Sequence, residues 1–346
     1  MNKREFLKTF SIGLVSVPFL GLIETNAKDV VANVFEPLND IGGNSFDVVI
    51  VGGSYAGLSA AMSLGRCLRK VLVIDNGQPR NQNVKQANNL FANDGVKPAS
   101  LKKEVVKQLE KYKQYLNFHI GTVAEVSGED SKFTVKTARG QIVSARKIIF
   151  ATGATDLLPE IAGLREQWGK NAHHCPYCHG FESVSGKTVL ISEGLSGAGL
   201  LGSLQHWSSN LTLCTDGFKD IPPQMNTYLT DIKTSLNTDK IKRIVSKPNG
   251  DLVGIEFEND KTVPFDHIYI STKPQYRTEL AEKLGCKKDK SNRLETGDFM
   301  ESSVKGVYAI GDISNKSVGQ ILWAAHSGMM SAVNINNSLI AVKFQR

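Results

Sequence analysis

The stretch FDVVIVGGSYAGLSAAMSLGRCLRKVLVID, residues 46–75, constrains the fold more than any other part of the sequence. An apolar run ends in two glycines, a segment with helical periodicity follows, and a second apolar run ends at Asp75. Strand, glycine turn, helix and strand in this order make one βαβ unit of a parallel sheet. The chain is therefore predicted to be an α/β protein.

The turn of this unit has the spacing of a dinucleotide-binding loop. In such a loop the first glycine makes the tight turn, the second lets the backbone approach the diphosphate, and the third lets helix and strand pack closely. The middle position is Ser54, which is small enough for that approach, and the helix start favours the diphosphate through its free N–H groups. Asp75, at the end of the second strand, is placed to accept from the ribose hydroxyls. The predicted loop consists of Gly52, Gly53, Ser54, Tyr55, Ala56 and Gly57.

Later segments predict a second domain of the same kind. KTVLIS (187–192) begins another strand, turn and helix, and KGVYAIGD (305–312) is a strand that ends in a glycine–acid pair before a further helix. Short alternating runs over about 117–151 predict an antiparallel meander. We therefore expect two Rossmann-like domains of three ββα layers, the first interrupted by the second. The expected boundaries are an export signal at 1–27, a linker at 28–44, the first domain at 45–158 and 273–346, and the central domain at 159–272.

The glycine turn of the central domain departs from the dinucleotide pattern. Glu193 stands at the first glycine position, where its charge opposes a diphosphate, and Leu195 stands at the second, where it fills the space that the diphosphate needs. The next strand ends at Asp216, where an NADP site presents arginine. We predict that the central domain keeps its fold and has lost its pyridine nucleotide. The alternative is a shifted loop that uses Gly194, Gly197 and Gly199.

The first residues have the order of an export signal. MNKREFLK is basic, TFSIGLVSVPFLGLI is apolar, and ETNA ends in small residues, with Ala27 as the expected last residue of the signal. The apolar run is shorter than the ~20 residues of a membrane-spanning helix. Lys3 to Lys8 also resembles a twin-arginine signal, with Lys in place of the first Arg. We expect a periplasmic protein without stable membrane insertion after signal removal, and an uncleaved anchor is the alternative.

Charge and cysteine usage exclude several other classes. The net charge is +7, but basic residues alternate with acidic ones, as in KKDKSNRLE (287–295), so no nucleic-acid partner is expected. The five cysteines are too few and too spread for a disulfide scaffold. Cys67 and Cys214 lie in apolar surroundings and are predicted to pack in the core. Only Cys175 and Cys178 are spaced as a unit.

The run HHCPYCHGFE (173–182) allows three chemistries, namely a redox dithiol, half of a zinc site, or the attachment of a c-type haem. Zinc needs four ligands, and beyond His173, His174 and His179 no second ligand pair is present in the sequence. Haem would have to share one chain with a dinucleotide site. A dithiol beside a flavin explains both features, and His179 can move the proton of thiol chemistry. The alternative for His179 is a hydrogen-bonded structural histidine.

The order VIVGGSYAGLSAA, DNGQPRN, ATGA, CPYC and GVYAIGD resembles the low-molecular-weight thioredoxin reductases over nearly the whole chain after about residue 45. Within that superfamily the chain is most similar to NADPH-independent dithiol oxidases of the gliotoxin and holomycin type, whose Cys-x-x-Cys-His-Gly matches Cys175 to Gly180. Thioredoxin reductases carry Asp at the position of His179. They also keep an intact second glycine motif and an arginine pair after the following strand.

This resemblance implies an FAD cofactor, held by the glycine loop and Asp75 and by residues further along the chain. It implies that Cys178 faces the flavin and Cys175 meets the substrate, and that the protein is a homodimer. His326 stands where thioredoxin reductases usually have Gly. The further cofactor residues implied are Arg80, Asn81, Asn89, Gly153, Gly311, Asp312, Gln320 and Ile321.

These observations together predict an exported FAD enzyme. It would oxidise a small-molecule or protein dithiol to a disulfide through Cys175 and Cys178 and pass the electrons to oxygen or another acceptor. One alternative is a disulfide reductase that draws electrons from NADPH or a protein donor. A second is a flavin-bound redox sensor without turnover. No metal is expected.

Overall fold

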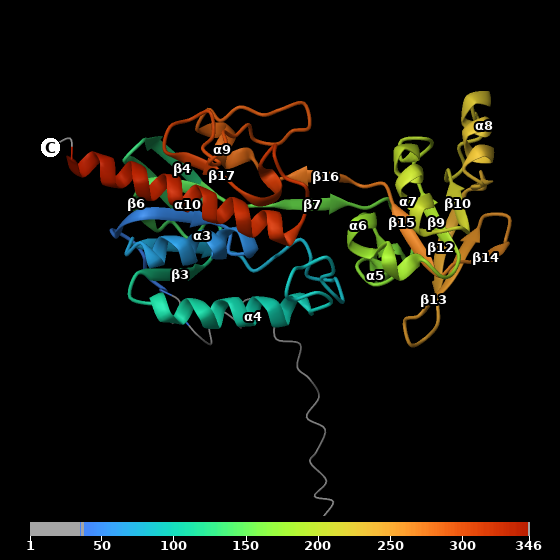
Figure 1. The fold of residues 1–346 in the computed structure, drawn as a ribbon, viewed down its shortest axis with the longest axis horizontal. Helices are drawn as coiled ribbons and strands as arrows, with labels where there is room; N and C mark the ends of the chain where they lie inside the picture. Colours follow the sequence, from blue (N-terminus) through green and yellow to red (C-terminus); the bar gives the residue numbers. More distant parts are fainter. Residues whose placement is uncertain (1–34, 36–37, 345–346) are drawn as a thin grey trace, which may run out of the picture.

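The computed structural model describes residue 35 and residues 38–344. Two α/β units lie side by side and are joined by a pair of strands (Figure 1). The first unit is built from both ends of the described chain, and the second from its middle. The predicted fold class, two nucleotide-binding domains with the first interrupted by the second, is confirmed.

The first unit is formed around a seven-stranded sheet with a parallel core. The apolar runs of the sequence form its buried central strands, and a two-stranded antiparallel extension continues one side of the sheet. In spatial order the core comprises β3 (Leu116–Ile120), β2 (Val71–Asp75), β1 (Ser45–Val51) and β6 (Ile142–Phe150), with β17 (Val307–Ala309) also on β6. The extension consists of β5 (Lys132–Thr137) and β4 (Val123–Glu129).

The prediction that the antiparallel meander begins at about residue 117 is wrong for its first strand. Strand β3 pairs parallel with β2, and only β4, β5 and β6 form the meander. The connection between β2 and β3 contains α4 (Pro98–Leu109) and η1 (Glu110–Tyr112), so it is a crossover and not a hairpin. An alternating pattern reports which face of a strand is buried, but it does not report the direction of its neighbour.

Helices α3 (Tyr55–Arg66) and α10 (Ile321–Phe344) lie against each other on one face of this sheet (Figure 1). They approach closely because Gly328 has no side chain, since a Cβ there would lie 2.3 Å from the carbonyl oxygen of Ala56. Ser59 donates a hydrogen bond to the carbonyl of Ala325 at 2.6 Å. This contact fixes the glycine loop, at the start of α3, relative to the start of α10. The unit also contains α9 (Glu279–Lys283) and η4 (Gly311–Ile313).

The central unit repeats the α/β plan with a smaller sheet. Its five-stranded sheet is parallel throughout, and a three-stranded antiparallel sheet stands beside it. The parallel strands are β11 (Ser235–Asn237), β10 (Leu211–Cys214), β9 (Thr188–Ile191), β15 (His267–Ile270) and β8 (Ala172–His173). The antiparallel strands are β12 (Ile241–Ser246), β13 (Leu252–Phe257) and β14 (Thr262–Pro264). The helices are α5 (Leu164–Gln167), α6 (Pro176–His179), η2 (Phe181–Ser183), η3 (Ala198–Leu200), α7 (Leu201–Trp207) and α8 (Pro223–Asp231).

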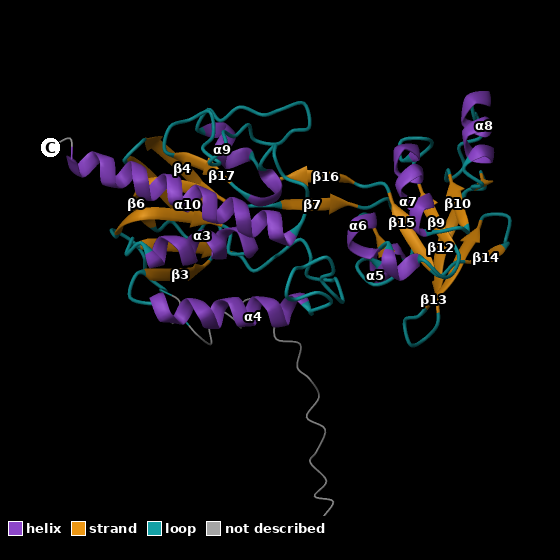
Figure 2. Cartoon of the chain, in the orientation of Figure 1, coloured by secondary structure: helices purple, strands orange, loops and turns teal. Residues whose placement is uncertain are grey.

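The chain passes between the units twice, through neighbouring antiparallel strands (Figure 2). It leaves through β7 (Ala154–Leu157) and returns through β16 (Lys273–Tyr276). These strands lie next to the expected boundaries at 158 and 272. The predicted signal at 1–27 lies outside the described residues. Among the residues that are described, no helix has the length and apolar character needed to span a membrane.

The two isolated cysteines differ in burial. Cys214 is fully buried, as predicted, but the prediction that Cys67 packs in the core is wrong because its side chain is exposed. Helix α3 ends at Arg66, and the backbone of Leu68 adopts a φ of 59°. The apolar helical pattern predicted that the helix would continue through Cys67 and bury its side chain. The helix instead ends one residue earlier, so the side chain of Cys67 lies on the surface.

Candidate active site

Two glycines of the first loop are required by close backbone contacts. Gly52 has a φ of 109°, and a Cβ there would lie 2.3 Å from the carbonyl oxygen of Ala151. A Cβ on Gly57 would lie 2.0 Å from the carbonyl oxygen of Gly52. The first glycine therefore makes the turn, and the third lets helix α3 pack on strand β1.

The start of α3 and the end of β2 form one polar cradle. Ser54 occupies the N-cap without a side-chain capping bond, and the first turn of α3 contains no acidic residue. The backbone of Gly53 packs directly against Asp75. A Cβ added to Gly53 would lie only 2.8 Å from the Cβ of Asp75. Because uncapped amides and a helix dipole attract anions, this cradle suits a diphosphate next to a ribose-binding carboxylate.

A cavity of about 440 Å³ extends from this cradle to the cysteine pair. It brings together residues of both units that lie far apart in the sequence. Gly57 and Asn89 lie outside its lining, which is consistent with the packing role of Gly57. The predicted residues that line it are Gly52, Gly53, Ser54, Tyr55, Ala56, Asp75, Arg80, Asn81, Gly153, Cys175, Cys178, His179, Gly311, Asp312, Gln320 and Ile321.

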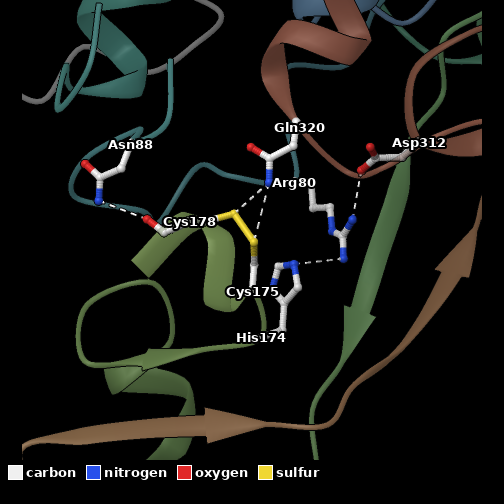
Figure 3. Close-up of a disulfide and its surroundings, with 7 residues drawn as sticks. All are labelled: Arg80, Asn88, His174, Cys175, Cys178, Asp312 and Gln320. Atoms are coloured by element: carbon white, nitrogen blue, oxygen red, sulfur yellow. Dashed lines mark hydrogen bonds and ion pairs between the residues drawn. A yellow bond between two sulfur atoms is a disulfide. The ribbon is translucent and has the colours of Figure 1, made fainter. Parts of the chain in front are cut away.

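Asn88 lines the cavity, whereas its neighbour Asn89, which the resemblance implied as a cofactor residue, does not. The amide nitrogen of Asn88 donates to the carbonyl of Cys178 at 3.0 Å (Figure 3). It also donates to the carboxylate of Glu182 at 3.0 Å. Asn89 instead has a φ of 57° and donates its backbone N–H to Asp94. Sequence reasoning missed Asn88 because both residues lie in an irregular segment, where no periodic pattern specifies which side chain points inward.

Cys175 and Cys178 form a disulfide at the central unit's wall of the cavity. Cys175 is the N-cap of the short helix α6, and Cys178 lies within it. Gln320, just before α10, donates its side-chain amide to Cys178 Sγ at 3.2 Å, and Cys175 Sγ lies 3.6 Å away (Figure 3). Both cysteines are half-buried, so the disulfide is accessible from the cavity.

A stacked pair of histidines lies beside the disulfide. The rings of His173 and His179 stack with their centroids 3.8 Å apart. Burial, and then the charge of His174, lowers the pKa of His179 to about 4. Burial, and then the charge of His179, lowers the pKa of His173 to about 3. Both imidazoles are therefore neutral at neutral pH, and His179 is in the protonation state needed to accept a proton.

Arg80 contacts residues of both units beside the disulfide, and Figure 3 shows it between His174 and Asp312. Its guanidinium binds both carboxylate oxygens of Asp156, one of them at 2.8 Å, and Asp312 at 2.9 Å. It also lies 3.4 Å from the ring nitrogen of His174. Burial alone would lower the pKa of Arg80, but the hydrogen bonds and charges of the two aspartates outweigh burial and raise it. The arginine remains a permanent positive charge in the cavity wall.

The zinc alternative and His326 can both be compared with the structure. In the described part of the chain, no group of three or more His, Cys, Asp or Glu side chains could hold a metal ion. His326, on α10, packs against Trp323 with ring centroids 5.4 Å apart and lies outside the lining of the cavity.

The glycine turn of the central unit packs against residues of its own unit. The ring of Phe218 lies 3.6 Å from where a Cβ of Gly194 would be, and the amide of Gly197 donates to Ser192 Oγ at 2.8 Å. Leu195 packs against the apolar core of the unit. Asp216 pairs with Lys240 at 2.8 Å. The helical segment after this turn begins with η3 at Ala198 and continues as α7 from Leu201, whereas α3 begins directly after the first loop at Tyr55.

One cavity of this protein contains both an intact dinucleotide loop and a redox-capable disulfide. This combination places the protein in the class of two-domain thiol–disulfide oxidoreductases. The chain belongs to the pyridine nucleotide-disulphide oxidoreductase family, whose family model matches residues 46–334. It is a thioredoxin reductase-like member of this family of flavoproteins, as the sequence resemblance predicted.

Similar proteins cover nearly the same part of the chain. The thioredoxin reductase tcpT of Claviceps purpurea is 29% identical, over 84% of this chain and 95% of that protein. The thioredoxin reductase sirT of Leptosphaeria maculans is 27% identical, over 84% of this chain and 93% of that protein. Among solved structures, HlmI has a TM-score of 0.81 at 29% identity, over 89% of this chain and 96% of that protein. An oxidoreductase from Agrobacterium tumefaciens has a TM-score of 0.77 at 30% identity, over 86% of this chain and 99% of that protein.

Proposed function

We propose that this protein is an FAD-dependent dithiol oxidase that converts a dithiol substrate to a disulfide through Cys175 and Cys178. The observation that carries the proposal is the contrast between the two nucleotide loops. The intact loop shares a cavity with the disulfide, whereas the turn of the central unit carries Glu193 and Leu195 at the first two glycine positions and packs against its own residues. A chain with one open loop is suited to a flavin and poorly suited to NADPH.

The residues of the first unit fit FAD. The adenosine diphosphate half would lie at the glycine loop and Asp75, where a side chain on Gly53 would collide with Asp75. The remaining holding residues are proposed to be Arg80, Asn81, Gly153, Gly311, Asp312, Gln320 and Ile321. When bound, FAD supplies the acceptor that takes the electron pair from the reduced cysteines and passes it to oxygen or another acceptor.

The cysteines carry out two thiol–disulfide exchanges. A substrate thiolate attacks Cys175 Sγ, the bond to Cys178 breaks, and Cys178 leaves as a thiolate. The second substrate thiol then attacks the substrate sulfur bound to Cys175 and releases a substrate disulfide and a Cys175 thiolate. Two electrons have then moved from the substrate to the cysteine pair. The first substrate thiol loses its proton to solvent and enters as the thiolate, and His179, neutral before the reaction, accepts the proton of the second thiol as it attacks and then passes it to solvent.

The hydrogen bond from Gln320 supports the assignment of different roles to the two sulfurs. Its amide is closer to Cys178 than to Cys175, and it would stabilise negative charge on Cys178 when the disulfide breaks. Cys178 is therefore proposed as the leaving sulfur that faces the flavin, and Cys175 as the sulfur that meets the substrate.

We also propose that the protein is exported. The basic, apolar and small-residue segments of 1–27 support this location, and a periplasmic site with little NADPH agrees with the loss of the glycine motif in the second loop. N-terminal sequencing of the protein from a periplasmic extract should begin at Lys28. Recovery of the full-length chain from the cytoplasm alone would reject export.

The decisive experiment is anaerobic. The FAD-loaded protein is mixed with NADPH and, separately, with dithiothreitol, and the flavin absorbance is recorded before and after air is admitted. A dithiol oxidase is bleached by dithiothreitol and not by NADPH, and its absorbance returns in air. Rapid bleaching by NADPH would instead establish a reductase, the activity that the names of the fungal relatives suggest.

Replacement of one sulfur tests the path of the electrons. Cys178→Ser should abolish bleaching by dithiothreitol, because the reduced pair can no longer form. Cys214→Ser is the matched control, because that cysteine is buried away from the cavity. Turnover that persists in Cys178→Ser would contradict the assigned path. Bleaching of the wild type by a dithiol without catalytic turnover would favour a redox sensor.

A further inference from the structure

Helix α4 contributes a buried lysine to the adenosine end of the cavity. The side chain of Lys102 is only 6% exposed, and its ammonium lies in the cavity wall 3.4 Å from the Asp75 carboxylate. The hydroxyl of Tyr55, in the glycine loop, donates to the carbonyl of Pro98 at 3.1 Å. The first turn of α4, and with it Lys102, is thereby fixed against the loop.

The hydrogen-bonding capacity of this ammonium is mostly unused. An ammonium has three donors, and a charge-assisted bond to a carboxylate is normally 2.7–2.9 Å long. Within the described residues Lys102 has one acceptor, Asp75, at a longer distance than that. A buried charge with so few partners carries a desolvation cost that an apolar side chain of similar length would avoid. The arrangement indicates an acceptor-rich ligand at this position.

The charge balance of the cradle supports the same conclusion. Asp75 adds a negative charge beside the place where a diphosphate would bind, and Lys102 is the cation next to it. Its ammonium can neutralise Asp75 and also attract the anionic cofactor. The permanent cation Arg80 is occupied by Asp156 and Asp312 in another part of the wall.

We propose that Lys102 is a cofactor-binding residue, whose ammonium orients Asp75 and donates directly to oxygens of the ADP half of FAD. The inference uses only the flavin of the proposed function and not its dithiol oxidase activity. Lys102 acts on the retention and selection of the cofactor and takes no part in sulfur chemistry.

The test uses the full chain, from which FAD is released by dilution and followed by flavin fluorescence. Lys102→Met should raise the FAD dissociation constant about tenfold or more, whereas Lys103→Met, on the exposed side of the same helix, should not. ADP should compete with FAD in the wild type and much less in Lys102→Met. FMN, which lacks the adenosine, should bind both proteins equally. Unchanged FAD and ADP binding in Lys102→Met would overturn the proposal.

A second set of variants separates direct binding from an effect through Asp75. If Lys102 contacts the cofactor, Lys102→Met weakens FAD binding in an Asp75→Asn background as well. If the lysine only neutralises Asp75, its replacement has no effect in that background and direct contact is rejected. Lys102→Arg keeps the charge and should retain FAD within a few-fold, which controls for misfolding of the Met variant.

The outcomes for Lys102 and for the proposed function are distinguishable. A wild-type protein that binds neither FAD nor ADP would remove both assignments. A wild type that binds FAD but is bleached by NADPH would remove the oxidase activity and leave the Lys102 result intact. Equal FAD retention in wild type and Lys102→Met would remove the lysine assignment alone.

Discussion

At the residue scale, the stacked histidines determine how the redox site responds to acid. His173 and His179 have ordinary pKa values of 6.5 in an unfolded chain, and burial lowers these values to about 3 and about 4 in the folded protein. At a pH between the folded pKa values and 6.5, these two histidines bind more protons in the unfolded chain than in the folded protein. The stability that this difference contributes is therefore present above about pH 6.5 and is lost as the pH falls through the folded values.

The histidines around the pair act in this direction, against a smaller opposing effect of a hydrogen bond between His173 and the backbone of Lys170. His174 and His267 face His173, and His174 also faces His179, so a proton on one of these rings would repel a proton on its neighbour. Glu182 is bound to Asn88, so a carboxylate of the neighbouring helical turn already has a partner. A proton on either stacked imidazole is thus both desolvated and next to other potential cations.

His173→Phe keeps a stacking ring and removes one titrating group. Its free energy of unfolding should fall less between pH 6.5 and pH 4 than that of the wild type, by about 1–2 kcal/mol once partial exposure is allowed for. Denaturant unfolding at several pH values measures this difference. His206→Phe is a control on an exposed histidine and should follow the wild-type curve. Parallel curves for wild type and His173→Phe would show that His173 does not titrate in this way.

At the element scale, the contact between α3 and the loop before it positions the cofactor cradle. The Cα of Gly57 lies directly against the carbonyl of Gly52, so the first turn of the helix has no room for a methyl group. An alanine in a helix is ordinarily favoured over glycine by about 1 kcal/mol. At Gly57 we expect alanine to be less stable than glycine, because its methyl group would collide with the backbone carbonyl of Gly52, which cannot rotate away as a side chain can.

Gly57→Ala should therefore destabilise the protein by about 1–3 kcal/mol and reduce its FAD content, since the loop must shift to admit the methyl group. Gly199→Ala is the matched control, because a Cβ at Gly199 meets no atom within 4 Å. Thermal unfolding and the flavin-to-protein absorbance ratio measure both effects. Equal stability and flavin content in the two variants would contradict the packing role assigned to Gly57.

At the scale of the whole molecule, a segment of the first unit holds the redox helix of the central unit near the cavity. Arg80 reaches Asp156 and His174, and Asn88 binds the backbone of Cys178. Between them, the backbone N–H of Lys85 donates to the carbonyl of Gly169 at 3.2 Å. These contacts come from one continuous segment, residues 80–88, so the position of the disulfide depends on both units.

We propose that the protein is a homodimer that buries an apolar stripe on α10. Leu322, Met329, Val333 and Ile340 repeat at helical spacing along the solvent side of this helix, and each is at least 39% exposed. Exposed apolar residues that gather on one helix face are typical of an association surface.

Val333→Glu should convert a wild-type dimer into a monomer, because it places a charge in the middle of the stripe. Phe299→Glu, a similarly exposed apolar residue outside α10, should leave the dimer intact. Sedimentation equilibrium measures the mass of each form. A monomeric wild type, or a Val333→Glu variant that remains a dimer, would reject this surface.

The local chemistry of the site is visible in the sequence. The glycine spacing, the acid at the end of the second strand and the Cys-Pro-Tyr-Cys-His run depend on turns and on neighbours a few residues apart. The fold class follows from the same patterns, since each strand, turn and helix is encoded by its own periodicity. For this reason the loop from Gly52 to Gly57 and the pair Cys175 and Cys178 are identifiable from the order of the amino acids alone.

Other features depend on which distant segments meet. The parallel pairing of β3, the exposure of Cys67 and the inward turn of Asn88 are decided by the crossover, the helix end and the irregular segment that contain them. The stacking of His173 on His179 and the approach of Lys102 to Asp75 also have no local signature. A sequence pattern reports burial and turn geometry along one segment, whereas burial of a charge and the partners of a side chain are set by packing between segments. The sequence by itself therefore determined the chemistry available to this protein, and the tertiary structure decided which groups share the cavity.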